Sequence, residues 1–378
     1  MKRWGSRSVL GTACIVAVGA LLLPVSLAAP ANATTATQAA AAFAAMTRTQ
    51  RVAQLLMVGC PSTSVTSACL SAIGTQHVGA VILDGNSTLS IAQEHTITAA
   101  LQHAAPAHRK LFIATDQEGG LVRRMRGPGF TDYSTALVQG TWNTADLQYW
   151  ATTWGRQLKS AGINVDLAPV LDTVPAGDTN NPPIGDLDRE YGHTPSIVTT
   201  KGLAVAKGLR AGGALPTVKH FPGLGRVTSN TDTSSGVTDT ITTSSSSYLH
   251  PFAAAVTANV PFVMMSTAIY PRLGSTNPAA FSYTIVTGLL RNTLGFHGVV
   301  VSDDLGAARQ VAAYSVGSRA TRFLGAGGDM ILTVRSSQAS TMISAILARM
   351  RTSTAYTAKV YAAVHRVLRA KAAAGLLD

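Results

Sequence analysis

The stretch LPTVKHFPGLGRVTSNTD, residues 215–232, shows most directly how the chain folds. It begins with a short apolar run, changes character at Lys219 and His220, and continues through Pro222-Gly223 into a polar loop. An apolar run bounded by turn residues predicts a buried strand. A strand that delivers a cation and an imidazole into a glycine-containing loop is typical of active sites in α/β barrels. The alternative is a surface turn with incidental charges, so the other strand ends decide between the two.

Short apolar segments alternate with helical patterns along the rest of the chain. The predicted strands are Leu55–Gly59, Val78–Leu83, Leu111–Asp116, Asn164–Pro169, Leu215–His220, Phe262–Ser266, Val299–Asp303 and Asp329–Thr333. The predicted helices include Gln38–Gln54, Thr88–Ala104, Thr144–Ala161, Pro195–Ala211, Tyr283–Leu294, Ala308–Leu324 and Thr357–Leu377. Nearly continuous apolar strands are expected in a parallel sheet covered on both faces. The sequence therefore predicts an α/β fold, a single (β/α)8 barrel with enlarged loops over residues 34–378. A doubly wound sheet is the alternative, although no strand is followed by a G-x-G-x-x-G turn.

The first 33 residues have the pattern of a secretory signal peptide. A basic start is followed by the apolar run Val9–Leu23 and by Ala31-Asn32-Ala33, a small-residue cleavage signal. An uncleaved membrane anchor is the alternative. Cleavage would remove three basic residues and no acidic one, so the net charge of +12 would fall to about +9. The basic residues that remain are dispersed and form no aromatic-interleaved stripe, which argues against nucleic acid as a partner. We expect a secreted or cell-wall-associated protein, a monomer, whose positive charge suits an anionic wall.

Two cysteines, Cys60 and Cys69, would remain after cleavage. A pair separated by nine residues in an exported protein predicts one disulfide that closes a small loop. No second His/Cys pair with ligand spacing lies near them, so we expect neither a metal nor another cofactor.

Charged residues are scarce, at 13% of the chain, yet several of them lie where predicted strands end. Asp116 ends the third strand, Lys219 and His220 end the fifth, and Asp303 ends the seventh. Because the carboxyl ends of barrel strands surround one site, these residues predict a catalytic pocket. Structural roles remain the alternative, and they are the favoured interpretation for two further carboxylates, Asp172 and Asp304.

The motifs DQEGG, NVDLAPVLD, KHFPGLG, GVVVSDDL and AGGDMIL, in this order, resemble glycoside hydrolase family 3. They are most similar to its β-N-acetylglucosaminidase branch, and the resemblance covers essentially all of residues 34–378. It implies a TIM barrel and a retaining mechanism in which Asp303 is the nucleophile. The sugar-binding residues that it implies are Asp116, Arg124, Arg189, Lys219 and His220. Arg189 lies in DREYG, which matches the family's RSFG only loosely.

The loop after KHFPG departs from this resemblance. The branch usually reads KHFPGHGDTxxDSH and uses the final His, held by the preceding Asp, as its acid/base. Here Leu224 and Arg226 replace the first His and Asp, and Asn230 and Asp232 stand where the dyad should be. Either Asp232 has become the acid/base or the loop is catalytically impaired. We expect Asp232 to serve as the acid, since carboxylic acids are the usual proton donors of glycosidases. Gly223 and Gly225 would give this loop freedom to move.

The resemblance therefore implies a β-N-acetylhexosaminidase that removes terminal N-acetylglucosamine from cell-wall or related glycans. A β-glucosidase of the same family is one alternative, and a sugar-binding barrel with impaired catalysis is another. Two further departures bear on the substrate: Leu121 replaces the Arg of DQEGGRV, and Ser266-Thr267-Ala268 stands where the branch usually has a His.

Overall fold

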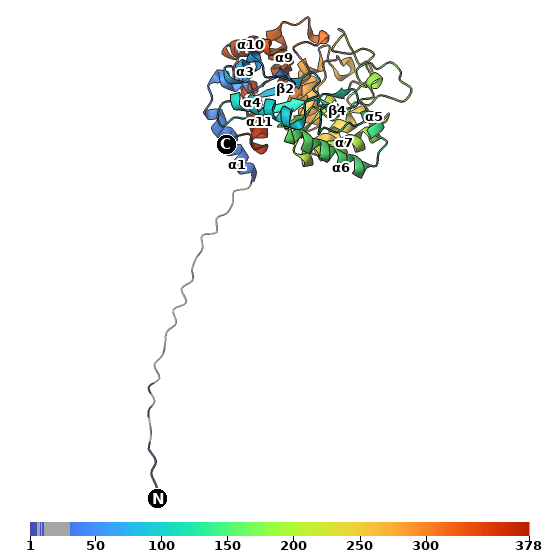
Figure 1. Cartoon of the computed structure of the whole chain (residues 1–378). Coiled ribbons are helices and arrows are strands. Elements are labelled where there is room, and N and C mark those ends of the chain that lie inside the picture. The colour runs from blue at the N-terminus through green and yellow to red at the C-terminus, as the bar shows by residue number, and fades with distance from the viewer. Residues whose placement is uncertain (6–7, 9, 11–30, 378) are drawn as a thin grey trace.

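In the computed structural model, which describes residues 1–5, 8, 10 and 31–377, a parallel eight-stranded sheet forms the centre of the protein (Figure 1). The strands follow the order β10-β1-β2-β3-β6-β7-β8-β9. Their bounds are β1 Leu56–Pro61, β2 Ala80–Asp84, β3 Phe112–Thr115, β6 Val165–Asp166, β7 Leu215–Phe221, β8 Phe262–Met265, β9 Val299–Ser302 and β10 Ile331–Thr333. A parallel bridge between Val301 and Met330 brings the two ends of the sheet together. The predicted (β/α)8 barrel is confirmed, and so are all eight predicted strands.

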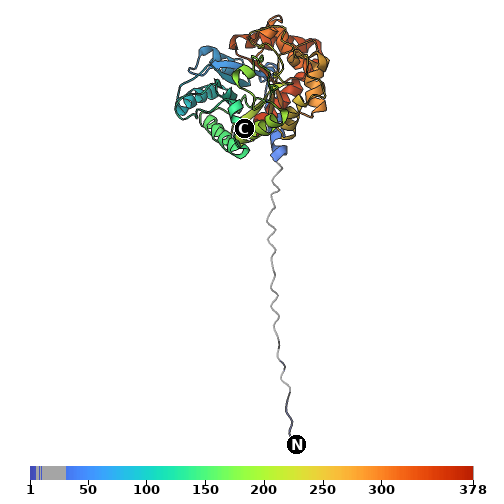
Figure 2. The same cartoon turned by 90° about the vertical axis from the view of Figure 1, so that its right-hand side faces the viewer.

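The helices lie outside the sheet and cover it (Figures 1 and 2). They are α1 Ala31–Ala44, α2 Arg48–Ala53, α3 Ser67–Gly74, α4 Ile91–Ala104, α5 Ala136–Gln139, α6 Thr144–Ser160, α7 Pro195–Gly212, α8 His250–Thr257, α9 Val316–Ala326, α10 Ala339–Thr352 and α11 Thr354–Ala373. Residues Thr284–Thr293 form a π-helix. Strands such as β3, β8 and β9 are buried along their whole length, because side chains fill the barrel inside and helices cover it outside.

Three element predictions were wrong in their extent. The helix predicted over Gln38–Gln54 is divided into α1 and α2, because Thr47 and Gln50 form a capping box that starts a new helix. The helix predicted over Ala308–Leu324 begins only after Ser315, which caps α9. The fourth strand is limited to Val165–Asp166, and only isolated pairing, such as the bridge between Val170 and Lys219, continues beyond it.

Most of the predicted signal peptide, including Val9–Leu23, lies outside the described residues. Cys60 in β1 and Cys69 in α3 are joined by a disulfide with Cα atoms 5.8 Å apart. Among the described residues, no helix has the length and apolar character needed to cross a membrane.

Candidate active site

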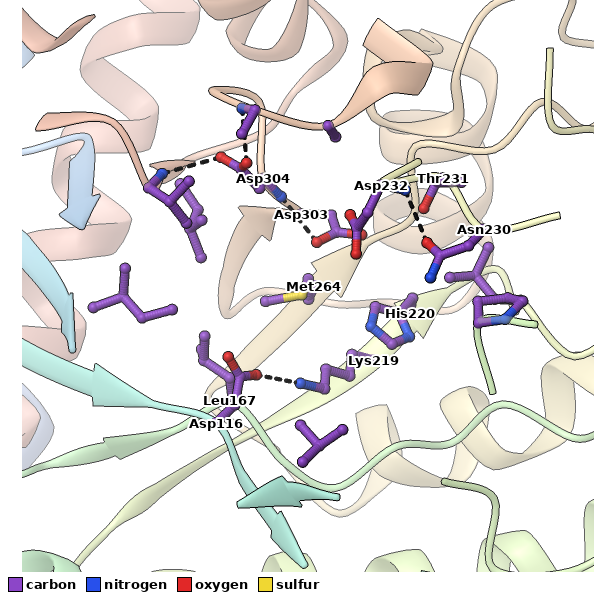
Figure 3. Close-up of a pocket in the computed structure, with 18 of the residues that line it drawn as sticks. Asp116, Leu167, Lys219, His220, Asn230, Thr231, Asp232, Met264, Asp303 and Asp304 are labelled. Atoms are coloured by element: carbon purple, nitrogen blue, oxygen red, sulfur yellow. Dashed lines mark hydrogen bonds and ion pairs between the residues drawn. The ribbon is translucent and has the colours of Figure 1, made fainter. Parts of the chain in front are cut away.

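A cavity of about 340 Å³ opens at the carboxyl ends of the barrel strands. All seven residues predicted to act in catalysis or sugar binding line it: Asp116, Arg124, Arg189, Lys219, His220, Asp232 and Asp303. Lys219 and His220 lie in β7, and the other five lie directly after strands or in the loops that follow them. Figure 3 shows five of the seven around one space. The barrel thus brings together residues that are up to 187 positions apart, from Asp116 to Asp303.

Lys219 forms the floor of this cavity between two carboxylates. Its side chain is only 2% exposed, and its Nζ lies 2.6 Å from Asp116 Oδ1 and 2.6 Å from Glu118 Oε1. Burial lowers the pKa of Lys219, but the two carboxylates outweigh it and raise the pKa above the ordinary value. Lys219 therefore stays charged, and Asp116, which is 20% exposed, keeps part of its carboxylate open to the cavity.

Glu118 connects the floor to Arg189. The guanidinium donates from Nε to Glu118 Oε2 at 2.8 Å and from Nη2 to Oε1 at 2.7 Å, a bidentate pair. Burial alone would raise the pKa of Glu118, but Arg189 and Lys219 hold it well below its usual range. Arg189 Nη1 also donates to the carbonyl of Pro183 at 2.7 Å, so its position is fixed. Glu118 was not among the predicted site residues, although it lies within the DQEGG motif that contains Asp116.

Asp172 orients His220. Its Oδ2 lies 2.7 Å from His220 Nδ1, and its Oδ1 accepts the amide hydrogens of His220 and Leu224. Burial raises the pKa of Asp172, but the ring of His220 and these hydrogen bonds outweigh it, so the pKa is lowered. These contacts agree with the structural interpretation of Asp172, because they hold His220 in place at the cavity.

Two adjacent aspartates after β9 are used differently. Asp304 accepts hydrogen bonds from the amides of Gly306, Ala307 and Val334, so its carboxylate is occupied by the loop. Asp303 accepts a single hydrogen bond, from the amide of Asp304 to Oδ1 at 2.8 Å. Its backbone is tied to β8 through the carbonyl of Met265. Asp303 is thus held on a rigid strand end with carboxylate capacity left for a ligand.

Asp232 lies beside Asp303 in the close-up view (Figure 3). Its backbone amide donates to Asn230 Oδ1 at 2.8 Å, which forms a tight turn. As a residue Asp232 is exposed to water, although protein atoms lie close around its carboxyl group. Desolvation, followed by repulsion from Asp303, raises the pKa of Asp232 to about 6. A carboxyl group with a raised pKa next to a second carboxyl group is the arrangement that an acid and a nucleophile require.

Arg124 lies at the rim, where β5 (Val122–Arg123) ends. Its amide donates to the carbonyl of Asp116 at 3.1 Å, and its Nη1 lies 3.3 Å from Asn86 Oδ1. The hairpin of β4 (Gln117–Gly119) and β5, which the sequence did not predict, places Arg124 over Asp116. Leu121, at the tip of this hairpin, is 63% exposed and does not line the cavity, so the departure from the family motif there does not reach the site.

A closed (β/α)8 barrel with paired carboxyl groups and a floor of charged hydrogen-bond donors and acceptors defines the class: a barrel enzyme built for a hydroxyl-rich ligand. Within residues 31–377, no group of three or more His, Cys, Asp or Glu side chains is arranged to hold a metal ion. The model of the glycosyl hydrolase family 3 N-terminal domain matches residues 47–370, and the chain belongs to this family of glycoside hydrolases.

Several proteins named as β-hexosaminidases or β-N-acetylglucosaminidases are similar to this chain over most of its length. A "Beta-hexosaminidase" of Xylella fastidiosa is 31% identical over 302 residues, which cover 78% of this chain and 88% of the relative. The crystal structure of a β-N-acetylhexosaminidase from Beutenbergia cavernae superposes with a TM-score of 0.85 at 44% identity, covering 87% of this chain and 99% of that one. A family 3 β-N-acetylglucosaminidase from Paenibacillus superposes with a TM-score of 0.81 at 30% identity, covering 88% and 63%.

Proposed function

We propose that this protein is a retaining β-N-acetylhexosaminidase that hydrolyses terminal N-acetylglucosamine residues, with Asp303 as nucleophile and Asp232 as acid/base. The observation that carries the proposal is the pairing of these two carboxyl groups in one cavity, where the pKa of Asp232 is raised to about 6. The named activities of the relatives favour N-acetylglucosamine as the sugar. A cavity of about 340 Å³ is at the small end of ligand pockets and suits one terminal sugar.

In the first step, a carboxylate oxygen of Asp303 attacks the anomeric carbon. The bond from this carbon to the leaving oxygen breaks, and that oxygen keeps the electron pair and takes the proton of Asp232. At pH 7, a carboxyl group with a pKa of about 6 is about one-tenth protonated, compared with roughly one in a thousand for an ordinary aspartate. The products are a free alcohol and a sugar ester of Asp303.

In the second step, water attacks the anomeric carbon and gives a proton to Asp232 while Asp303 leaves as a carboxylate. Esterified Asp303 carries no charge, so its repulsion of Asp232 disappears and the pKa of Asp232 falls. The same group is thereby converted from acid to base. Two inversions at one carbon retain its configuration. A carboxylate base also repels phosphate, so we expect hydrolysis and no acceleration by added phosphate.

The floor of the cavity holds the sugar hydroxyls. Asp116 accepts from them, and Lys219, His220, Arg124 and Arg189 donate. Because Glu118 and Asp172 fix the orientation of these donors, the ring can be bound without rearrangement of the floor.

The test is a side-by-side assay of the nitrophenyl N-acetylglucosaminide and the nitrophenyl glucoside. Faster release from the N-acetylglucosaminide is expected. Faster release from the glucoside would make the protein a β-glucosidase, and tight product binding without turnover on either substrate would make it a sugar-binding barrel. After trapping with a slow fluorosugar, the label should lie on the peptide containing Val299–Leu305, and a label elsewhere would refute the assignment of Asp303.

We further propose that the protein is exported and acts as a monomer on cell-wall or related glycans. The basic and apolar pattern of the first 33 residues and the bonded pair Cys60–Cys69 support export. Mass spectrometry of the secreted protein should give an N-terminus at Thr34. A chain retained in membranes with its N-terminus intact would indicate an anchor.

A further inference from the structure

The loop that follows β7 is fastened to its surroundings where the sequence leads us to expect freedom. Arg226, which replaces the family's Asp, is buried and donates to Asp239 Oδ2 at 3.2 Å and Thr242 Oγ1 at 2.8 Å. The ring of Tyr248 lies 4.0 Å from its guanidinium carbon. Gly225 packs directly against the carbonyl of Thr173, where a Cβ atom would come within 2.0 Å. This glycine therefore serves close packing and not mobility.

The neighbouring barrel loops hold the same segment from the other side. The hydroxyl of Tyr270, from the loop after β8, donates to the carbonyl of Gly223 at 2.8 Å. In the loop after β9, the amides of Arg309 and Gln310 donate to the carbonyls of Asp232 and Thr231, both at 3.0 Å. The acid residue is thus bound through its own main chain.

Gln310 also bridges a single residue of this segment with its side chain. Its Oε1 accepts the amide hydrogen of Val237 at 2.9 Å, and its Nε2 donates to the carbonyl of Val237 at 3.1 Å. Gln310 is buried, so these bonds are shielded from competing water. Together with its backbone bond to Thr231, Gln310 fixes both ends of the short stretch that carries Asp232.

We propose that Gln310 is a positioning residue that holds Asp232 opposite Asp303 before substrate binds. Asp303 is the first residue of the loop after β9, and Gln310 lies seven positions later in that same loop. One loop therefore carries the nucleophile at its start and fixes the acid at its end, which ties the spacing of the two carboxyl groups to a single element. Since a retaining reaction needs a defined spacing, a small displacement of Asp232 should reduce proton transfer more than sugar binding. The inference rests on the proposed role of Asp232.

The experiment compares Gln310→Ala with a matched control, Gln102→Ala. Gln102 in α4 makes the same pair of bonds to one residue, Leu111, at 2.8 and 3.0 Å, but at the amino end of β3. For Gln310→Ala, kcat/KM should fall by about tenfold or more on a poorly activated sugar and by less than about threefold on a dinitrophenyl sugar, with product binding unchanged. Gln102→Ala should lower Tm and leave the ratio of the two substrates as in the wild type. Equal losses on both substrates, or no loss, for Gln310→Ala would overturn the proposal.

Two further measurements secure the result. Gln310→Met keeps the length of the side chain and removes only its hydrogen bonds, so it replaces the Ala variant if that one does not fold. In the wild type, hydrogen exchange of the Val237 amide, which donates to Gln310 Oε1, should be slow without ligand, and fast exchange that slows only with product would overturn the proposal.

The failure of the inference can be separated from failure of the proposed function through Asp232→Ala. If Asp232→Ala loses equally on good and poor leaving groups, the acid assignment fails and the role of Gln310 fails with it. If Asp232→Ala shows the expected dependence on the leaving group and neither Gln310 variant does, only the positioning role is wrong.

Discussion

The two ends of the barrel each bury a lysine, and the two lysines differ in every other respect. At the carboxyl end, Lys219 lies between Asp116 and Glu118, which raise its pKa. At the amino end, Lys371 of α11 is fully buried, and its Nζ donates to the neutral amide of Gln54 at 2.8 Å. Burial, with a smaller contribution from Arg109, lowers the pKa of Lys371 to about 7.

The difference shows how one residue type can serve two purposes in one fold. A buried ammonium group remains charged only where carboxylates offset its desolvation. The carboxyl end assembles such groups and can use them on a ligand, whereas the amino end tolerates a single desolvated amine. Substitutions of the ligand-facing carboxylates at the carboxyl end should therefore change catalysis first, and substitutions at the amino end should change stability alone.

The largest effect is expected for Asp303→Asn. Loss of the nucleophile should reduce kcat by about three orders of magnitude or more, with a thermal transition close to that of the wild type. The neighbouring variant Asp304→Asn is the matched control, since it replaces one of the two oxygens that accept from three loop amides and should lower Tm. If Asp303→Asn unfolds the protein while its activity per folded molecule persists, the aspartate is structural.

Asp232→Ala should reduce kcat on poorly activated sugars by about 10²–10⁴-fold and largely spare the first step on a dinitrophenyl sugar. Added azide should restore turnover. Because the protonated form of Asp232 is needed and its pKa is about 6, kcat/KM of the wild type on poor substrates should fall as pH rises above about 6. In Asp232→Ala, kcat/KM should not show this fall with rising pH. If kcat/KM of Asp232→Ala still falls above about pH 6, the proton comes from another group.

Asp116→Ala tests the floor of the cavity. Its carboxylate is the part of the floor left open to a ligand, so product binding should weaken by about tenfold or more while Tm changes little. Isothermal titration and a thermal melt measure both quantities. Unchanged binding with a large loss of Tm would show that Asp116 only neutralises Lys219.

Methionine at each lysine should shift stability in opposite directions. Lys219→Met leaves Asp116 and Glu118 without their shared cation and should cost about 3–5 kcal/mol. For Lys371, the folded pKa lies below the unfolded value, so the unfolded state binds more protons between about pH 7 and 10.5 and wild-type stability rises with pH in this window. Lys371→Met should therefore stabilise the protein most at pH 7 and below, and the gain should shrink toward pH 10. Thermal melts of both variants at pH 6, 8 and 10 measure the change in stability. A change of the same sign in both variants would contradict the predicted difference between the two lysines.

The smallest effect is expected at the disulfide, which lies at the carboxyl end but outside the floor. Alkylation without reductant should leave Cys60 and Cys69 unmodified in the secreted protein. Reduction should cost about 2–3 kcal/mol on the chain-entropy model and change kcat little. Two free thiols in the native secreted protein would contradict the bridge.

Much of the barrel follows from local pattern, because parallel strands covered on both faces are buried and mostly apolar, as the three valines at the start of Val299–Ser302 are. The carboxyl ends of barrel strands surround one site, so the linear sequence is enough to predict that Asp116, Lys219 and Asp303 meet. Helix ends were harder to predict. The break at Thr47 depends on a capping box, and propensity alone favours one continuous helix through the Ala-rich sequence.

The linear order of residues is enough to identify the strand-end carboxylates, the cationic floor and the absence of a His where the family's dyad would lie. The fold sets the pKa values of these residues and the contacts that hold them in place. The pKa of Asp232 depends on its desolvation and on Asp303, 71 positions away. The loop that carries Asp232 is held by Gln310 and Tyr270 from two other barrel loops. In the sequence, Lys219 and Lys371 are both simply lysines, and their different environments appear only in the folded protein. Electrostatic energies depend on distance and on the exclusion of water, and only the folded chain fixes either.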